Sequence, residues 1–458
     1  MTFKKKILII LSIILLAFII GSIFISKSEN KYVKKITLLI PTNIKSFVRD
    51  TVFIIPKHFR EFNFLKSKTS ILQGRITNLE EENKAIKASL FAGQKTSDQI
   101  ISSKNNKKFN LKVFQLPWGN FWASDPKQRK NHKRHGYLDE HLGDIYVVFF
   151  SGKILKFSKN EISNDFLNTK EINSNILTYL KNSNQKWVGV KDILIIKNDI
   201  YISYTKAIGD PKNDCYNTSI LKGTLGSDNI NFREWDKKEG PAQAGGRMIK
   251  FKNNIFLTVG DFKNLELYST VDKRLFCKIL SIDIDTKKYK IISKGHRNPQ
   301  GLLYIENKDL IISSEHGPKG GDEINKILID TKEVPHYGWP IASYGTFYGF
   351  ESTEIRKHII KYRNHKKNGF VEPILVYEPS IGPSQIVQAN YKSDNSYLVS
   401  SLSRRSLYEF DYYKEDKLAT KTDQLYIGER IRDIKLMEND QYFLILGNTG
   451  SFAILNPL

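Results

Sequence analysis

Cysteine is scarce in this 458-residue sequence, which contains only Cys215 and Cys277. Two cysteines exclude a fold held together by a network of disulfides, and the sequence leaves open whether this pair is free or bonded. The chain has other means of folding, because 40% of its residues are hydrophobic and 12% are aromatic. A chain of this length and composition can bury a large core.

Acidic residues are also in short supply. The sequence has 48 Asp and Glu against 71 Lys and Arg, which gives a formal net charge of +23. Such a charge draws a protein towards anionic partners. No nucleic-acid-binding signature accompanies it, however, and the lysines are spread along the whole chain. We therefore interpret the charge as diffuse surface charge and expect no nucleic-acid partner.

One long apolar run lies near the N-terminus. Residues 7–26, ILIILSIILLAFIIGSIFIS, carry no charge and follow three lysines. As a helix, such a run rises about 30 Å, the thickness of a bilayer core. No A-x-A-like cleavage site follows it, so residues 1–27 are predicted to be a cytoplasmic tail and an uncleaved transmembrane anchor. We expect the rest of the chain on the periplasmic or extracytoplasmic side, although lysines beyond the run weaken the charge argument for this orientation.

Residues 28–92 predict a membrane-proximal and helical stalk. Apolar residues recur every seven positions at Leu65, Leu72, Leu79 and Ile86. A second series of the same period lies at Phe62, Thr69, Ile76, Asn83 and Leu90. This heptad pattern indicates either a self-associating coiled coil over residues 62–90 or an amphipathic helix that lies on the neighbouring domain. Residues 93–109 are polar and are interpreted as a linker.

From residue 110 onward the pattern changes to alternating strands joined by tight polar turns. The turns fall at Gly143, Asn198, Asn253, Asn307, Asp394 and Asn439, at intervals of 55, 55, 54, 87 and 45 residues. One such unit cannot bury both of its faces, so six of them predict an all-β, six-bladed propeller over residues 110–458. The longest interval predicts an insertion near residues 331–372, and insertions on repeat scaffolds tend to build the binding face.

Two polar clusters flank one strand pair in residues 295–327. Arg297 offers a planar fork for a carboxylate, and Asn298 offers both a donor and an acceptor, although both could instead serve a network between blades. Gly317 and Pro318 suit either bare carbonyl ligands for Ca²⁺ or a tight turn.

Two further pairs of charged residues leave alternatives open. Asp322 and Glu323 suit either a second calcium site or the capping of the next segment. Arg430 and Arg432, in RIRD, place two guanidinium groups on one side of a strand, for a ligand or for structural ion pairs.

Five motifs occur in the order seen in the glucose/sorbosone dehydrogenase family: GHRNPQG, EHGPKGGDEIN, HYGWP, EPSIGPS and RIRD. The sequence resembles this family over most of residues 110–458. The resemblance implies a six-bladed propeller, usually exported, that binds pyrroloquinoline quinone (PQQ) and Ca²⁺ and oxidises aldose sugars by hydride transfer to the quinone.

The resemblance also implies roles for individual residues. Cofactor or substrate contacts would be made by Asn184, Arg297, Asn298, Arg430 and Arg432. Gly317 and Pro318 match the carbonyl ligands of the cofactor's Ca²⁺. Asp261, in TVGDF, matches the acid that orients the family's catalytic histidine.

The sequence departs from the family where the chemistry takes place. Gln243, in QAGGR, stands at the position of the family's base, and an amide cannot accept a proton near neutral pH. Ser403 stands where the family has a cofactor-binding lysine, with Arg404 beside it. His296 and His316 are candidates for a substitute base.

Two functions follow from these observations. One is a membrane-anchored PQQ-dependent aldose sugar dehydrogenase-like protein that lacks the usual base. The other is a catalytically inactive propeller that binds a glycan, an envelope component or a partner protein. On either hypothesis we expect little or no sugar oxidation.

Overall fold

The computed structural model describes residues 42–118, 134–163, 165–180, 188–207, 216–237, 245–261, 275–349, 356–357 and 359–458. The chain divides into two compact units, Met1–Glu80 and Glu81–Leu458, which are described separately. The predicted anchor over residues 1–27, Asn184 and Gln243 all lie outside the described residues. Within the described part of the chain, no helix combines the length and the apolar character that crossing a membrane requires.

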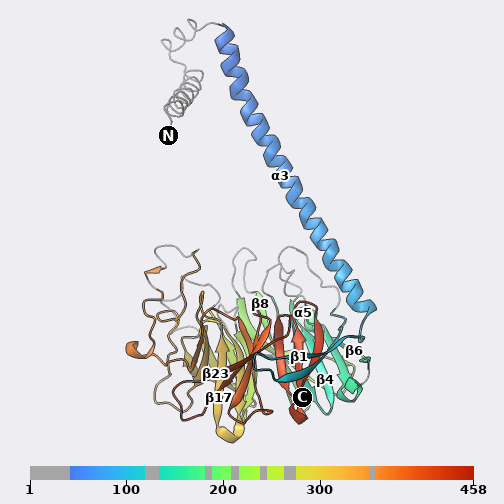
Figure 1. Cartoon of the computed structure of the whole chain (residues 1–458), viewed down its shortest axis with the longest axis vertical. Helices are drawn as coiled ribbons and strands as arrows, with labels where there is room; N and C mark the ends of the chain where they lie inside the picture. Colours follow the sequence, from blue (N-terminus) through green and yellow to red (C-terminus); the bar gives the residue numbers. More distant parts are fainter. Residues whose placement is uncertain are drawn as a thin grey trace. The chain divides into compact units, whose positions relative to one another are not determined.

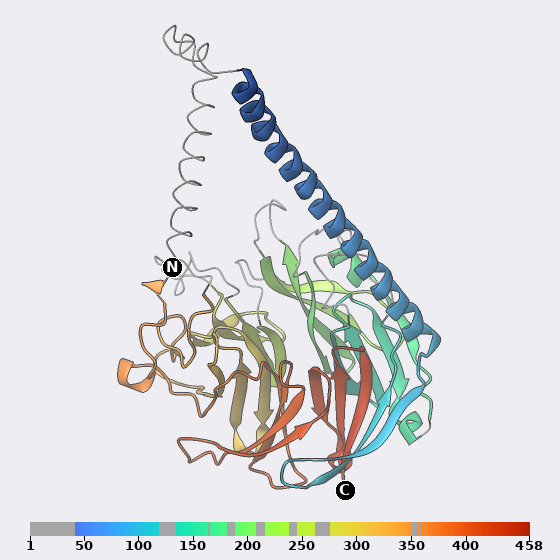
Figure 2. The same cartoon turned by 45° about the horizontal axis from the view of Figure 1, so that its top comes forward.

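The strands of the described residues form six sheets, antiparallel except for the short parallel pair of β10 with β6, which confirms the predicted six-bladed propeller. The innermost strands contact one another in the order β3, β7, β12, β16, β20 and β24, and β24 contacts β3 to close the ring. Figure 2 shows the sheets following one another around this ring, from green through yellow to red.

Each blade is one sheet, and its first three strands follow the sequence outward from the axis. The first blade consists of β3 (Gly136–His141), β4 (Asp144–Phe149), β5 (Ile154–Ser158), β6 (Lys170–Ser174) and the short β10 (Asn229–Ile230). The second consists of β7 (Gly189–Ile196), β8 (Asp199–Ala207), β9 (Tyr216–Thr224) and β11 (Arg233–Lys237). The third consists of β12 (Gly245–Phe251), β13 (Asn254–Val259), β14 (Lys278–Asp283) and β15 (Tyr289–Lys294). The fourth consists of β16 (Pro299–Ile305), β17 (Leu310–Glu315), β18 (Asp322–Ile327) and β19 (Leu375–Tyr377). The fifth consists of β20 (Pro383–Gln388), β21 (Ser396–Ser401), β22 (Ser406–Asp411) and β23 (Thr420–Tyr426).

The sixth blade joins the two ends of the propeller. It consists of β24 (Ile431–Leu436), β25 (Tyr442–Leu446), β26 (Ser451–Pro457), β2 (Lys108–Phe114) and β1 (Lys95–Ser102). β2 pairs with β26 from Phe109 opposite Pro457 to Phe114 opposite Phe452, and β1 pairs with β2 on the outside. Figure 1 shows β1 beside the red C-terminal strands. Residues 93–109, interpreted as a linker, therefore include the outermost strand of a blade.

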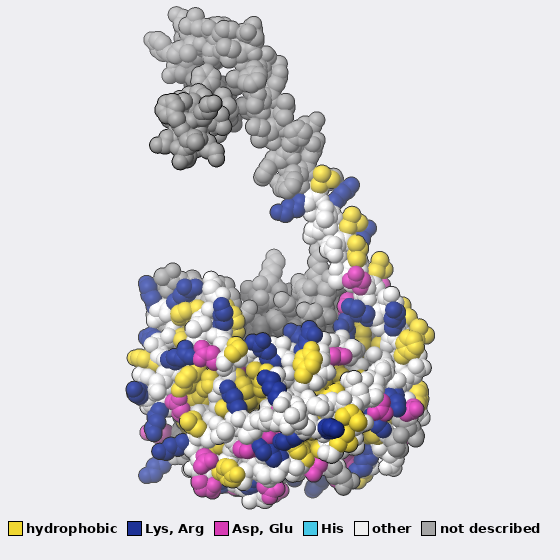
Figure 3. Space-filling model, viewed as in Figure 1, with side chains coloured by type: hydrophobic (Ala, Val, Ile, Leu, Met, Phe, Trp, Pro, Cys, Tyr) yellow, Lys and Arg dark blue, Asp and Glu magenta, His cyan; other side chains and the backbone are white. Residues whose placement is uncertain are grey.

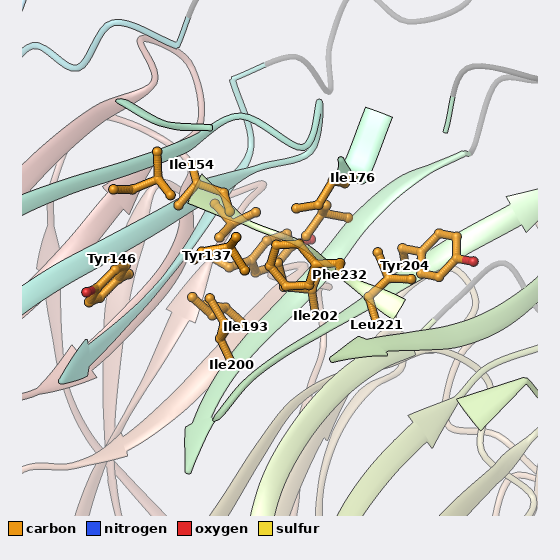
Figure 4. Close-up of a cluster of buried hydrophobic side chains, with 14 of the residues drawn as sticks. Tyr137, Tyr146, Ile154, Ile176, Ile193, Ile200, Ile202, Tyr204, Leu221 and Phe232 are labelled. Carbon is orange, nitrogen blue, oxygen red and sulfur yellow. The ribbon is translucent and has the colours of Figure 1, made fainter. Parts of the chain in front are cut away.

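Adjacent blades pack through apolar side chains that alternate along their strands. Between the first two blades, Tyr137 and Ile154 meet Ile193, Ile202 and Leu221 in a fully buried cluster. Figure 4 shows these side chains converging from the two sheets. Each fully buried Ile or Leu contributes roughly 1.5–3 kcal/mol of hydrophobic free energy, so the ring is held mainly by these interfaces.

The six predicted turns all join the first and second strands of a blade. Gly143, with φ +83°, is one example of the left-handed backbone that such turns require. The predicted insertion lies between β18 and β19 and includes the short 3₁₀ helix η4 (Lys366–Asn368). The other short helices are α5 (Ile176–Leu180), η1 (Lys159–Ser163), η3 (Glu306–Lys308) and η5 (Glu438–Asp440).

The predicted stalk is helical over α3 (Thr42–Leu90). Side chains of this helix are described from Leu65 onward. Figure 3 shows Lys and Arg dispersed over the visible face of the protein with Asp and Glu between them, as expected for diffuse surface charge.

Candidate functional site

Charged side chains gather where the innermost strands begin. Arg247 is the third residue of β12, and its Nη1 donates to Oδ1 of Asp192 on β7 and to Oδ1 of Asp433 on β24, both at 2.8 Å. β12 and β24 belong to opposite blades, so the bond to Asp433 crosses the axis. The second oxygen of each aspartate accepts a backbone N–H, from Met248 at 2.6 Å and from Leu138 at 2.9 Å.

Burial determines how this cluster ionises. It raises the pKa of Asp192 to about 7 against the opposing effect of Arg247, and it also raises the pKa of Asp433. Burial opposes the charge of Arg247 too, but the two aspartates raise the pKa of its guanidinium above the ordinary value. Arg247 therefore stays charged and acts as a fixed brace between blades.

A cavity of about 380 Å³ follows the axis and is lined by all six innermost strands. Arg247 and Asp433 line it near the ends where these strands begin. Further along, it is lined by Asp139 on β3 and Lys435 on β24, which form an ion pair. The polar motifs and the axis-crossing ion pair thus lie at the same end of the channel.

Two cations at this end lack a carboxylate partner. Arg432 is only 8% exposed, and its Nε has no hydrogen-bond partner among the described residues. Lys191 is partly buried, with its Nζ 5.7 Å from the centre of the Phe150 ring, and in the described part of the chain no acid pairs with it. Burial, reinforced by the nearby charge of Arg432, lowers the pKa of Lys191 to about 7.

The backbone of Gly246 approaches Lys191 closely. It lies at an irregularity of β7, where the strand register shifts between Val190 and Asp192. A Cβ added to Gly246 would lie 2.5 Å from Cβ of Lys191, and Gly246 has a φ of +97°. Only glycine combines that backbone conformation with so close an approach. Gly246 follows Gln243 by three residues, although Gln243 itself is outside the described residues.

The structure connects Asn298 with Arg432. Oδ1 of Asn298 accepts from Nε2 of Gln300 at 2.7 Å and from the backbone N–H of Gly245 at 3.1 Å. Oε1 of Gln300 in turn accepts from Nη1 of Arg432 at 3.0 Å. Asn298 therefore positions Gln300, and through it the guanidinium of Arg432, whose Nε has no partner among the described residues.

Arg297 is oriented by the two motifs that follow it. Its Nη1 donates to the backbone carbonyls of His316 at 3.0 Å and Gly317 at 2.7 Å. The guanidinium lies 5.4 Å from the centre of the Trp339 ring and 5.8 Å from that of Tyr348, both in the insertion. The insertion thus packs against Arg297, and its part in a binding face stays a prediction.

The predicted metal ligands are engaged in hydrogen bonds within the loops. The Gly317 carbonyl accepts from Arg297, and the Pro318 carbonyl accepts from the backbone N–H of Gly321 at 3.1 Å. Asp322 uses Oδ1 for the N–H of Gly317 and Oδ2 for the N–H groups of residues 381 and 382.

Glu323 is buried close to a second carboxyl group. Burial and the neighbouring Glu315 raise the pKa of its carboxyl well above the ordinary value, which favours the neutral acid. Across the described residues, no group of three or more acidic, His or Cys side chains is arranged for a metal. The calcium role of these residues stays a prediction.

The histidines of the motifs are also occupied. His296 is fully buried, with Nδ1 2.9 Å from Glu315 and Nε2 2.8 Å from Oγ of Ser293, and burial lowers its pKa to about 3. Nε2 of His316 lies 2.7 Å from the carbonyl oxygen of Pro383. Both ring nitrogens of His296 are thus engaged, and so is Nε2 of His316; a substitute-base role for His316 stays a prediction.

The remaining residues named from the sequence are Asp261, Arg430, Ser403 and Arg404. Oδ2 of Asp261 accepts from Nε1 of Trp339 at 2.6 Å, so this acid holds the insertion against the third blade. Arg430 is exposed, as are Ser403 and Arg404. A catalytic or cofactor role for Arg430 and for Asp261 stays a prediction.

Sequence reasoning did not identify Lys191, Arg247 or Asp192 as parts of this end of the channel. A signal was present, because all three are charged residues at the start of strands that are otherwise apolar. Their pattern suggests inward-facing charge but does not reveal which blades face one another.

Comparisons with known proteins agree with this architecture. A family model described as glucose/sorbosone dehydrogenase matches residues 180–454. The aldose sugar dehydrogenase YliI of Escherichia coli strain K12 is 26% identical over 289 residues, which span 56% of this chain and 72% of that protein.

Solved structures share the fold. The soluble aldose sugar dehydrogenase of Escherichia coli in its apo form aligns with a TM-score of 0.57 and 17% identity, covering 79% of this chain and 99% of that one. The PQQ-bound aldose sugar dehydrogenase of Streptomyces coelicolor aligns with a TM-score of 0.54 and 17% identity, covering 76% of this chain and 98% of that one.

Proposed function

Because the chain belongs to the glucose/sorbosone dehydrogenase family, we propose that its propeller binds PQQ where the innermost strands begin and acts as an aldose sugar dehydrogenase-like protein. Relatives named as aldose sugar dehydrogenases, one of them PQQ-bound, support this choice of ligand.

The observation that carries the proposal is the pair of unbalanced cations, Arg432 and Lys191. Among the described residues, a buried guanidinium with an unsatisfied donor and a neighbouring ammonium without an acid both cost free energy. An anionic ligand would offset that cost. PQQ carries three carboxylates, so its chemistry fits these donors.

The chain's own residues would then bind and orient the ligand. Arg432 supplies charged donors, and Gln300 and Asn298 fix the direction of its guanidinium. Lys191 supplies a second positive charge below about pH 7. When bound, PQQ supplies the quinone that accepts a hydride. The hydroxyl proton of the sugar needs an acceptor, and the amide of Gln243 cannot serve as one. We therefore expect slow oxidation. No step is assigned to Ca²⁺.

We propose that residues 7–26 anchor the protein in a membrane, with the propeller on the periplasmic or extracytoplasmic side. The support is the length of the run and its lack of charge. Protease protection of the propeller in intact cells, lost when the outer barrier is opened, would agree with this location. Cleavage only after the inner membrane is lysed would contradict it.

PQQ binding is tested by titrating the detergent-solubilised full-length protein and following quenching of its tryptophan fluorescence. We expect saturable binding that weakens at least tenfold in Arg432→Gln. Arg233→Gln, an exposed arginine on β11, is the matched control and should bind like the wild type. Absence of saturable binding by the wild type would refute the proposal.

A catalytically inactive propeller that binds a glycan, an envelope component or a protein partner is the second candidate. It is favoured by the engagement of both ring nitrogens of His296 and of Nε2 of His316. Dye reduction by Gln243→His with PQQ and an aldose separates the two candidates. A rate about 10²-fold above the wild type favours the dehydrogenase, since a positioned base contributes about that much. PQQ binding without turnover in this variant favours the inactive propeller.

A further inference from the structure

Helix α3 presents a continuous apolar stripe to solvent. Its heptad a and d positions with described side chains include six large apolar residues: Leu65, Leu72, Ile76, Leu79, Ile86 and Leu90. Each of the six is at least 50% exposed, and Leu90 reaches 71%. Figure 3 shows yellow hydrophobic side chains on the described part of this helix. Six large apolar residues in one line favour contact with another protein surface.

The opposite face of the same helix is already occupied. Ala85 and Ala88, at heptad positions c and f, are buried in a core cluster with Phe114 and Leu116. Glu81, also at an f position, forms an ion pair with Arg134. The last turns of α3 are thus attached to the propeller by their c and f positions, which leaves the a and d positions free.

Charges beside the stripe indicate what covers it. In a parallel, in-register pair, each g residue meets the e residue five positions later on the other chain. The pairs of this sequence are Glu61 with Lys66, Lys68 with Gln73, Arg75 with Glu80, and Glu82 with Lys87. Opposite charges meet in three of these pairs and like charges in none, so the helix is complementary to a second copy of itself.

The seam residues specify the same register. Asn83 is a polar residue at an a position, and it meets another Asn83 only when the two helices are aligned. A shift of one heptad would place it against Ile76 or Leu90, where its amide would be buried without a partner. Leucine predominates at the d positions and the a positions include β-branched Thr69 and Ile76, a combination that favours two strands over three.

We propose that α3 pairs with α3 of a second copy of this chain, parallel and in register, as a two-stranded coiled coil over residues 62–90. This proposal is independent of ligand binding at the propeller. It predicts a dimer whose formation depends on the charges at positions g and e.

Sedimentation of the full-length protein in density-matched detergent tests the proposal. The wild type should sediment as a dimer. Variant A carries Arg75→Glu and Glu82→Lys. In a homodimer of variant A, residue 75 then meets Glu80 and residue 82 meets Lys87 of the other chain, so like charges face each other in both pairs. Variant B, Glu80→Arg with Lys87→Glu, does the same from the e positions. Each variant alone should have a dimer dissociation constant at least about tenfold higher than the wild type.

Mixing the variants provides the decisive control. In an A–B heterodimer every altered g residue again meets an opposite charge, so the mixture should recover the dimer that neither variant forms alone. Recovery also shows that both variants fold. A monomeric wild type, a dimer indifferent to these charges, or a mixture that stays monomeric would each overturn the proposal.

Discussion

The guanidinium of Arg247 on β12 lies 2.8 Å from the carboxylate of Asp433 on β24, although 186 residues separate them in the sequence. The two strands belong to opposite blades, so this ion pair spans the propeller axis. Asp192 holds the same guanidinium from β7. One side chain therefore ties three blades together beside the candidate PQQ site.

Replacing Arg247 with Met should destabilise the propeller by about 3–5 kcal/mol, because two buried carboxylates lose their counter-charge. The free energy of unfolding in urea measures this effect. Arg233→Met on the exposed face of β11 is the control and should change stability little. If Arg247→Met does not fold, Asp433→Asn provides a milder variant that still breaks the bond across the axis. Wild-type stability in both variants would contradict the bracing role.

PQQ binding should weaken as the pH rises through about 7, the pKa of Lys191 in the free protein. Below that pH the ammonium is charged and attracts a carboxylate, whereas above it the amine is neutral in the free protein and must take up a proton on binding. We expect affinity to fall roughly 3–10-fold between pH 6 and pH 8.5. Lys191→Met should bind less tightly at pH 6 and show a flatter profile. A wild-type profile in this variant would exclude Lys191 from the site.

Glu409 should stabilise the junction between the fifth and sixth blades. It bonds Lys107, which lies just before β2, at 2.9 Å and also Lys392 at 2.8 Å. Burial opposes its charge, but hydrogen bonds from Lys392, Tyr391 and Lys107 lower its pKa to about 2. Glu409→Gln should cost about 2 kcal/mol near neutral pH, less than a fully buried pair because the lysines are partly solvated.

The pH dependence of this variant follows from the lowered pKa. The stabilisation by Glu409 is fully present above the ordinary glutamate range near pH 4.5 and disappears as the pH falls towards 2. Unfolding curves of the wild type and Glu409→Gln should therefore converge over that interval. Glu415→Gln, at an exposed position, is the control. A difference that persists at pH 2 would show that packing, not charge, is responsible.

Asp322→Asn should lower stability by about 1–3 kcal/mol, since the amide cannot accept all the backbone N–H bonds that the carboxylate accepts. We expect the same loss in EDTA and in added Ca²⁺. Thermal unfolding under both conditions measures it. Calcium-dependent protection of the wild type that is absent in Asp322→Asn would instead identify this residue as a metal ligand.

The residues of the polar motifs show where sequence reasoning stops. The motifs placed Arg297, Asn298 and Arg432 at one end of the channel, and Asn298 and Arg432 are indeed linked through Gln300. The same motifs suggested metal ligands at Gly317 and Asp322, whose oxygens accept hydrogen bonds from neighbouring loops. Residue type indicates what an oxygen can bind, but its partner depends on segments far away in the chain.

The sequence by itself determined the number of blades, the place of each inner turn and the insertion between β18 and β19. These features are local, since alternating side chains and turn residues act over a few positions. Only the tertiary structure decided that β1 completes the sixth blade, that Arg247 faces Asp433, and that Lys191 has no acid beside it among the described residues. Closing a ring brings distant strands together, and a pattern along one strand contains no information about which strand lies opposite.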